Sequence, residues 1–397
     1  MRSSIMIKKK VMILRSFTLF CILLSMACQQ STEVESPPPS LPFSQSIEVG
    51  DLLYLSGQVG LNPTTKELAS GIEAETKVTM ENLGRELKAK GYGFSDVVAT
   101  HVWMTDLSKI GVMSQVYRSF FKTKDLPTRT TVGIDKLAIG ASIEIAMVAM
   151  RGEKKAIYPL EIKRDEWKLP FTPGILCGDY LFVSGQAGTS GGKLVEGDIK
   201  VQVSQTLTNI ESILKAGNMD FSNVVSTEVF MSSGEFFGPM SEVYVSKVPD
   251  PKPARVPILV SNIPLNSPVE ITMIASRKQK EPVLPEGMPP SGAYSRGLKV
   301  GNTIYIAGVF SGKETVADRV NDCLSRVKQI LEAGGFSLKN VVEARVYLSD
   351  MADYAEMNNA YRSYFPESPP TRATLGVAEL PGTNKIGMQF VAVKKGD

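Results

Sequence analysis

Three arginines recur in one short context along this chain and could bind negatively charged groups. Each lies two residues after a proline, in Pro127-Thr128-Arg129, Pro253-Ala254-Arg255 and Pro370-Thr371-Arg372. Fifteen residues further on, in apolar strand-like contexts, stand Glu144, Glu270 and Gly387. An arginine fork suits a carboxylate, and a glutamate can take a proton from water. The structural alternative is that the arginines form weak surface ion pairs, or that each glutamate pairs with an arginine of a neighbouring copy.

The segments around these residues also repeat, with a period of about 115–130 residues. In each copy an apolar stretch runs into a glycine (Gly57, Gly185 or Gly308), and a helical pattern follows. The pattern predicts strand–strand–helix–strand–helix–strand–strand in each copy, an α+β fold with one mixed sheet and two helices on one face. The expected domains are 41–152, 165–278 and 286–395, and the short charged links between them are 153–164 and 279–285.

The first forty residues differ from the rest in composition. Basic residues, Lys8 to Lys10 and Arg15, precede or interrupt an apolar run from Val11 to Leu24, and a short segment then ends at Cys28. Residues 1–27 therefore resemble a bacterial lipoprotein signal peptide, with a lipid on Cys28 and residues 28–40 as a linker. This predicts an exported, membrane-anchored protein of the bacterial cell envelope. A plain cleaved signal peptide and an N-terminal anchor helix are the alternatives.

The charge of the remaining chain bears on its partners. Without the five basic residues of the signal, 39 Lys and Arg stand against 41 Asp and Glu. A nearly neutral body is a poor candidate for binding nucleic acid through its phosphates.

Taken together, these motifs resemble the RidA/YjgF family of small imine and enamine deaminases. The Pro-x-Arg motif with its downstream glutamate carries most of the resemblance. The Ser-Gly-Gln turns at 56–58 and 184–186 support it, as does the segment 292–297, which is similar to the family's N-terminal Gly-Pro-Tyr motif. The resemblance implies chorismate-mutase-like domains that assemble as trimers with clefts between neighbours. We therefore expect a monomer that folds as an intramolecular pseudo-trimer.

The resemblance also implies an activity: hydrolysis of 2-imino or 2-enamino acids to 2-keto acids and ammonia, with no metal or organic cofactor. It makes Arg129, Arg255 and Arg372 the anchors of the substrate carboxylate, and Glu144 and Glu270 the groups that position water. The other expected site residues are the backbone contacts Gly57, Gly185 and Gly308, the pocket walls Phe43, Phe171 and Tyr294, and the threonines Thr131 and Thr374.

The copies depart from the family pattern in ways that predict unequal clefts. Gly387 stands in place of a glutamate, Ala307 and Val309 replace the serine and glutamine of the turn, and Pro257 replaces a threonine. We expect the cleft with Gly387 to bind ligand but to turn it over poorly. The alternative function is a non-catalytic module that binds small carboxylates, or an envelope scaffold.

Three further residues are expected to be structural. A ribonuclease activity is disfavoured because the chain has one histidine, His101, within a strand pattern where a packed role is expected. The isolated cysteines Cys177 and Cys323 fit buried thiols rather than a disulfide framework.

Overall fold

The computed structural model describes residues 42–159, 162 and 166–395. The expected signal peptide (1–27), linker (28–40) and lipidation site Cys28 lie outside these residues. Among the helices that are described, none combines the length and apolar character needed to cross a membrane.

The first repeat is built on a five-stranded mixed sheet with the order β1-β2-β6-β3-β4. Strands β3 and β4 run parallel, and the other neighbours are antiparallel. Its elements are β1 (Ser46–Val49), β2 (Leu52–Val59), α2 (Ile72–Ala89), β3 (Val97–Met104), α3 (Ile110–Ser119), β4 (Thr128–Gly133), β5 (Lys136–Leu137) and β6 (Ile143–Met150).

The second repeat has the same core arrangement, with the sheet order β13-β12-β14-β9-β8-β7. Its elements are β7 (Lys154–Ile157), β8 (Gly174–Cys177), β9 (Tyr180–Gln186), β10 (Thr189–Ser190), β11 (Lys193–Leu194), α4 (Ile199–Ala216), β12 (Val224–Met231), α5 (Phe237–Lys247), β13 (Ala254–Leu259) and β14 (Val269–Ser276).

The third repeat has the sheet order β15-β16-β17-β20-β18-β19-β5 and so takes in β5 from the first repeat. Its elements are β15 (Lys280–Val283), β16 (Gly297–Val300), β17 (Thr303–Ser311), α6 (Val316–Ala333), β18 (Val341–Leu348), α7 (Tyr354–Arg362), β19 (Thr371–Gly376) and β20 (Ile386–Val393). The element order expected from the sequence is therefore found in all three copies.

Two strands lie where the sequence indicated only links. Strand β7 lies in the link after the first repeat and pairs with β8, and β15 lies in the link after the second and pairs with β16. Each link thus adds an edge strand to the sheet that follows it, which fixes the start of the next repeat.

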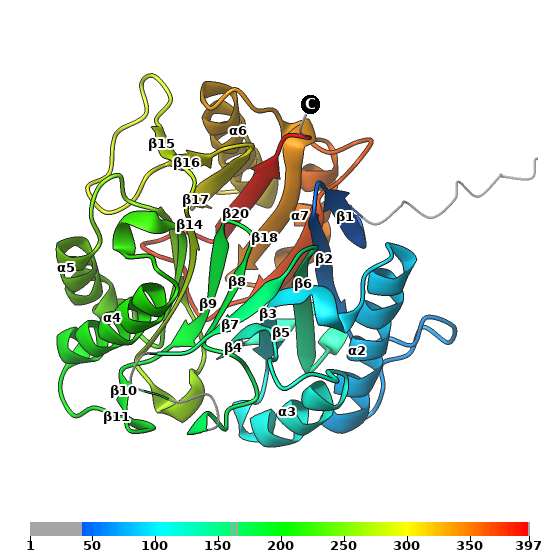
Figure 1. The fold of residues 1–397 in the computed structure, drawn as a ribbon. Coiled ribbons are helices and arrows are strands. Elements are labelled where there is room, and N and C mark those ends of the chain that lie inside the picture. The colour runs from blue at the N-terminus through cyan, green and yellow to red at the C-terminus, as the bar shows by residue number, and fades with distance from the viewer. Residues whose placement is uncertain (1–41, 160–161, 163–165, 396–397) are drawn as a thin grey trace, which may run out of the picture. The chain divides into compact units, whose positions relative to one another are not determined.

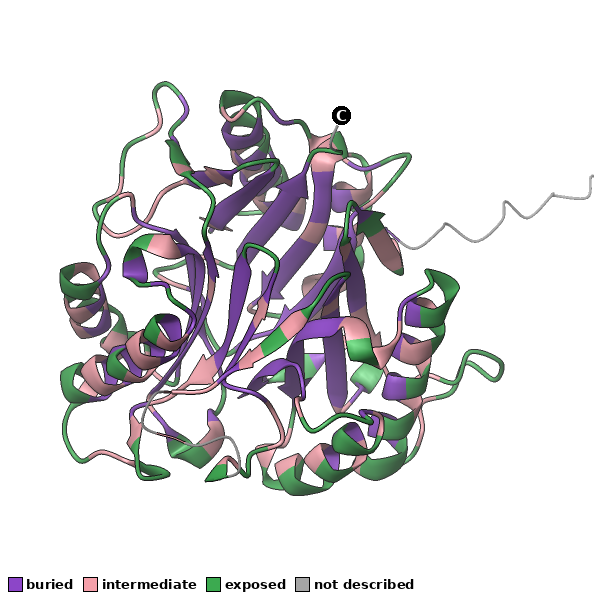
Figure 2. Ribbon diagram, viewed as in Figure 1, coloured by how far each residue is buried: buried purple, intermediate pink, exposed green. Residues whose placement is uncertain are grey.

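The helices cover one face of each sheet and bury their apolar sides against it (Figure 1). In α6 the buried positions Val316, Val320, Leu324, Val327 and Leu331 follow the helical spacing and join a core with β17, β18 and β20. Corresponding cores form under α2 and α3, and under α4 and α5. The strands are buried along most of their length, whereas the helices keep an exposed side (Figure 2).

The three repeats contact one another in a closed cycle. Strand β4 packs beside β9, β13 beside β17, and β19 beside β2. Short bridges follow the same order: Gly133 pairs with Asn262, Leu259 with Glu379, and β19 with β5. An apolar cluster also joins the three repeats, with Trp103 of β3, Phe230 of β12 and Tyr347 of β18 among its members. The strand contacts place the arginine-bearing strand of each repeat (β4, β13 or β19) against the glycine-turn strand of another (β9, β17 or β2).

Candidate active site

The strand β4 separates two environments because alternate side chains of a strand point to opposite faces. Thr128 and Thr130 line an interior cavity between the repeats. Arg129 and Thr131 point the other way, into a cleft that the second repeat completes with Gly185 and Glu270. We call this the 1–2 cleft. The arginine and the glutamate that face each other thus come from different repeats.

A buried serine fixes the backbone of the arginine in this cleft. The Arg129 N–H donates to Ser184 Oγ at 2.9 Å, and that hydroxyl donates to the Thr172 carbonyl at 2.6 Å. Between the third and first repeats the Arg372 N–H donates to Ser56 Oγ at 2.8 Å, and Ser56 donates to the Ser44 carbonyl. The serine of the Ser-Gly-Gln turn therefore holds the neighbour's arginine strand in register.

Aromatic rings flank each guanidinium. In the 1–2 cleft the Arg129 guanidinium lies 5.4 Å from the Tyr117 ring and 5.5 Å from the Phe171 ring, and Nη1 donates to Ser114 Oγ. Such contacts orient the cation while leaving its other donors for a ligand.

The corresponding arginine between the third and first repeats has the same surroundings. Arg372 lies 4.9 Å from the Tyr361 ring and 5.2 Å from the Phe43 ring, and its Nη2 donates to Asn358 Oδ1. The predicted wall residues Phe43 and Phe171 are thus in place. The tyrosines Tyr117 and Tyr361 are buried and also support the cation.

The two glutamates are held against glycines that leave them no spare room. A methyl group added at Gly185 would lie 1.9 Å from Glu270 Oε1, and one added at Gly57 would lie 1.7 Å from Glu144 Oε1. Any side chain at these positions would displace the carboxyl group. The glycines of the turn are therefore required by the glutamates, whatever backbone contacts they also offer to a ligand.

Burial dominates the electrostatics of both glutamates. It raises the pKa of Glu270 to about 8, opposed by the Thr131 backbone N–H and by the charge of Arg129. Burial likewise raises the pKa of Glu144 to about 8, opposed by the charge of Arg372 and by the Thr374 N–H. We call this second site, with Arg372, Glu144, Thr374 and Phe43, the 3–1 cleft. Both glutamates are thus poised to exchange a proton near neutral pH.

The 1–2 cleft opens into a cavity of about 670 Å³. Arg129, Thr131, Gly185 and Glu270 line its inner end. Its outer part is mostly apolar and includes Trp167, Leu169 and Leu265. The cavity is therefore large enough for an organic ligand beside Arg129 and Glu270.

The third site, the 2–3 cleft, keeps the arginine and its aromatic neighbours but lacks the glutamate and the serine of the turn. The guanidinium of Arg255 lies 4.8 Å from the Tyr244 ring and 6.0 Å from the Tyr294 ring. Arg255 is buried, and within the described residues its Nε and Nη1 have no hydrogen-bond partner. Ala307 stands where the other copies have the serine that binds the arginine strand.

The space of the missing glutamate is filled by an aromatic ring. Phe310 pairs directly with Gly387 across β17 and β20, and a methyl group on Gly387 would lie 2.7 Å from that ring. The N–H that reaches the glutamate in the other clefts has no counterpart here, because Pro257 has none. The three replacements are therefore consistent with one another: without a glutamate at Gly387, the ring of Phe310 takes its space and no N–H is needed from Pro257.

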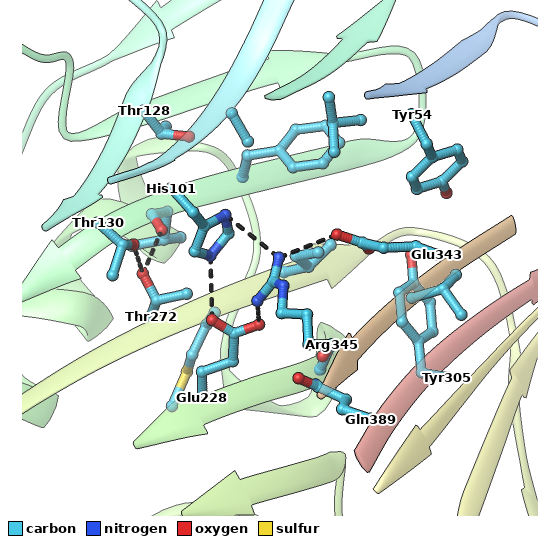
Figure 3. A pocket seen from close by; sticks show the side chains of 18 of the residues that line it. Tyr54, His101, Thr128, Thr130, Glu228, Thr272, Tyr305, Glu343, Arg345 and Gln389 are labelled. Carbon is cyan, nitrogen blue, oxygen red and sulfur yellow. Dashed lines mark hydrogen bonds and ion pairs between the residues drawn. The ribbon is translucent and has the colours of Figure 1, made fainter. Parts of the chain in front are cut away.

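A second cavity, of about 50 Å³, lies between the three sheets (Figure 3). His101, Glu228 and Arg345 occupy corresponding positions on β3, β12 and β18 and meet there. Glu228 accepts hydrogen bonds from Arg345 Nη1 and, at 3.0 Å, from His101 Nε2, while Arg345 Nη2 donates to His101 Nδ1 at 3.2 Å and to Glu343 at 3.1 Å. Burial lowers the pKa of His101 well below its usual value, so the ring is neutral in this network. His101 is thus structural, as expected.

The structure unites most of the predicted site residues in unequal sets. The 1–2 cleft holds Arg129, Thr131, Phe171, Gly185 and Glu270; the 3–1 cleft holds Arg372, Thr374, Phe43, Gly57 and Glu144; the 2–3 cleft holds Arg255, Tyr294 and Gly308. The serines of the turn and Ser114 were not among the predicted residues. The serines of the turn could have been predicted, because Ser56 and Ser184 both stand directly before the repeated glycine.

Other predictions concern groups outside the clefts. Cys177 and Cys323 are buried free thiols, as expected. Within the residues described, His, Cys, Asp and Glu side chains form no group of three that could hold a metal ion.

Comparison with known proteins now identifies the family. A family model described as Endoribonuclease L-PSP matches residues 33–151, 165–277 and 286–394. The chain therefore belongs to this family and contains three copies of its domain. The chain is 37% identical over 119 residues to a RutC family protein of Sulfurisphaera tokodaii, covering 30% of this chain and 94% of the relative. It is 35% identical to the 2-iminobutanoate/2-iminopropanoate deaminase of Mus musculus, over 30% of this chain and 87% of the mouse protein. The resemblance to RidA/YjgF proteins is therefore confirmed.

Solved structures include similar single domains. RidA from an Antarctic Psychrobacter is 32% identical, with 29% of this chain and 94% of that chain covered and a TM-score of 0.28. The Escherichia coli protein TdcF, solved with bound serine, is 27% identical, with 30% of this chain and 94% of that chain covered and a TM-score of 0.28.

Proposed function

We propose that this chain hydrolyses 2-imino acids, or their 2-enamine tautomers, to 2-keto acids and ammonia in its 1–2 and 3–1 clefts. The observation that carries the proposal is the placement of a buried arginine from one repeat opposite a buried glutamate from another, beside a glycine that the glutamate requires. The deaminase relatives from mouse and human, 35% and 36% identical over one domain, support the same reaction class.

The residues of the 1–2 cleft can divide the reaction between them. The Arg129 fork, oriented by Tyr117 and Phe171, binds the substrate carboxylate and so holds the imine carbon towards Glu270. Ionised Glu270 takes a proton from a water molecule as the water oxygen bonds to the imine carbon, and passes that proton to the nitrogen. A second transfer moves the hydroxyl proton to the nitrogen, the C–N bond breaks, and ammonia leaves as the keto group forms.

The raised pKa of the glutamates suits this double role. A carboxyl group that ionises near pH 8 both accepts and returns a proton more readily near neutral pH than one with an ordinary pKa. Arg372 and Glu144 perform the same steps in the 3–1 cleft. In the 2–3 cleft Arg255 retains unpaired donors for a carboxylate, whereas Phe310 fills the position of the base, so this site binds without turnover.

The other candidate functions have less support. A module that only binds small carboxylates would need the arginines, but it would not need two buried glutamates with a pKa of about 8. The family description names an endoribonuclease. The single histidine of the chain is hydrogen-bonded to Glu228 and Arg345 away from the clefts, so it is not placed to cut RNA there.

We also propose the assembly and location of the protein. The cyclic contacts among the repeats support a monomer that acts as an intramolecular trimer, since every cleft is completed within one chain. The signal-like first 27 residues and Cys28 support export and attachment to a membrane of the cell envelope.

The test is release of 2-keto acid from 2-iminopropanoate and 2-iminobutanoate generated in situ. The wild-type chain should exceed the spontaneous rate, and Arg129→Ala/Arg372→Ala should abolish the excess. Arg255→Ala is the matched control and should lower the rate far less. If this double variant failed to fold, Arg129→Lys/Arg372→Lys would replace it and should also lower the rate, since lysine keeps the charge but lacks the bidentate fork. A folded wild-type chain that gives no acceleration would refute the proposal.

A further inference from the structure

The cavity of the 1–2 cleft extends well beyond Arg129 and Glu270 at its inner end. Its volume of about 670 Å³ lies within the range of roughly 300–1,000 Å³ typical of sites for drug-sized ligands. An imino acid with a methyl or ethyl side chain would occupy only the part between Arg129 and Glu270. The apolar side chains that line the cavity include Ile110, Trp167, Leu169, Ile263 and Leu265.

Two of these apolar side chains are unusually exposed. Leu169 is 51% exposed and Leu265 is 60% exposed, although both line the cavity. Leu265 also has a φ of 64°, a left-handed conformation that is uncommon for residues other than glycine, asparagine and aspartate. An apolar residue held at such a position in a cleft would be covered if a ligand placed an apolar group against it.

Trp167 is connected directly to the wall of the charged site. Its Nε1–H donates to the Phe171 carbonyl at 2.6 Å, and its ring packs edge-on to the Phe171 ring at 5.7 Å. Phe171 in turn lies over the Arg129 guanidinium. The indole therefore forms a continuous apolar surface with the ring that orients the carboxylate anchor.

The 3–1 cleft has bulkier residues at two positions of the corresponding helix. Gly111 and Ser114 of α3 line the 1–2 cavity, and their counterparts in α7 are Ala355 and Asn358. The side chain of Asn358 reaches Arg372 and binds it. The two clefts that retain a glutamate thus differ in the space beside the arginine.

We infer that the 1–2 cleft acts on 2-imino acids with large apolar or aromatic side chains, such as those derived from leucine and phenylalanine. The 3–1 cleft acts preferentially on the short ones. This inference rests on the proposed function. With the carboxylate on Arg129 and the imine carbon facing Glu270, the substituent of that carbon extends towards Trp167 and Leu265, where its apolar surface is buried.

The test compares imino acids generated in situ from alanine, 2-aminobutyrate, leucine and phenylalanine by an amino-acid oxidase. Removing the base from one cleft should change the ratio of the phenylalanine-derived rate to the alanine-derived rate. Glu270→Gln should lower this ratio at least about 10-fold, because a general base contributes roughly 10²–10⁴-fold at its own site. Glu144→Gln should raise the ratio.

A second pair of variants tests the apolar wall without touching the charged pair. Leu265→Asn should lower the same ratio about 3- to 10-fold, as expected when one apolar contact of a pocket is lost. Its matched comparison is Ile139→Asn, in the corresponding turn of the first repeat, where Ile139 has a φ of 52°. Because the first repeat supplies Glu144 to the 3–1 cleft, this variant should not lower the ratio. Asparagine tolerates this conformation, so both variants should fold.

The outcomes separate the inference from the function on which it rests. Turnover of the short imino acids alone, or a ratio that Glu270→Gln leaves unchanged, would overturn the inference and leave the deaminase proposal intact. If the folded chain accelerated hydrolysis of no imino acid, the proposed function would fail and the inference with it.

Discussion

Glu270 should lower the stability of the folded chain as the pH rises, and its replacement by glutamine should remove that effect. The pKa of Glu270 is raised from 4.5 to about 8 by burial, so the unfolded chain loses this proton at a lower pH than the folded chain does. The protonated Glu270 carboxyl therefore favours the folded chain. This contribution to the free energy of unfolding is fully present below about pH 4.5 and is lost as the pH rises through 8. Glutamine stays neutral throughout this range.

The size of the effect follows from the pKa difference. Each pKa unit is worth about 1.4 kcal/mol, so ionisation of Glu270 should lower the free energy of unfolding on the order of 4 kcal/mol between pH 4.5 and pH 9. Glu270→Gln should match the wild type at pH 5 and exceed it by a few kcal/mol at pH 9. The measurement is urea unfolding followed by circular dichroism at pH 5, 7 and 9.

The comparison within each pH removes the contributions of all other titrating groups. Glu144→Gln should behave in the same way, since burial raises the pKa of Glu144 to about 8 as well. Equal losses of stability in wild type and both variants between pH 5 and pH 9 would contradict this prediction, because they would show that neither carboxyl is costly to ionise in the folded chain.

Two further substitutions test the packing of the interior and of the site. Arg345→Met should lower the free energy of unfolding by about 3–5 kcal/mol in urea, because it leaves Glu228 buried without its cationic partner; a loss below about 1 kcal/mol would contradict this. Gly185→Ala should displace the Glu270 carboxyl and reduce keto acid release from phenylalanine-derived imine, whereas Gly93→Ala, whose added methyl would meet its nearest neighbour at 3.5 Å, should not; equal rates would contradict the close fit.

The repeat, the order of its elements and the core faces of its helices could be predicted because they depend on local patterns. Helical spacing of apolar residues identified α6 and its end at the glycines after Ala333. The short strands β7 and β15 could not be predicted, since charged segments such as 154–157 become strands only when an edge of the next sheet is available to pair with them.

The site residues could be named from the sequence, but not assigned to clefts. Nothing local indicates that Arg129 meets Glu270 of the second repeat rather than Glu144 of its own, because that depends on how the repeats close on one another. The interior cluster shows the same limit. His101, Glu228 and Arg345 look unrelated along the chain, and their complementary hydrogen bonding exists only where three strands converge.

The differences among the clefts illustrate how linked copies can diverge. In an assembly of identical subunits, one residue type would occupy all three positions of the interior cluster, and three arginines or three glutamates there would repel one another. A single chain can instead place His101, Glu228 and Arg345 at these positions. The same freedom allows Phe310 to fill one cleft while two others keep their glutamates.

The most direct test of the proposed reaction is keto acid release from 2-iminobutanoate by wild type, Glu144→Gln, Glu270→Gln and the double variant. Wild type should exceed the spontaneous rate, each single variant should keep part of the excess, and the double variant should lose it while remaining folded. A double variant as fast as the wild type would contradict the claim that hydrolysis takes place in two clefts and depends on these glutamates.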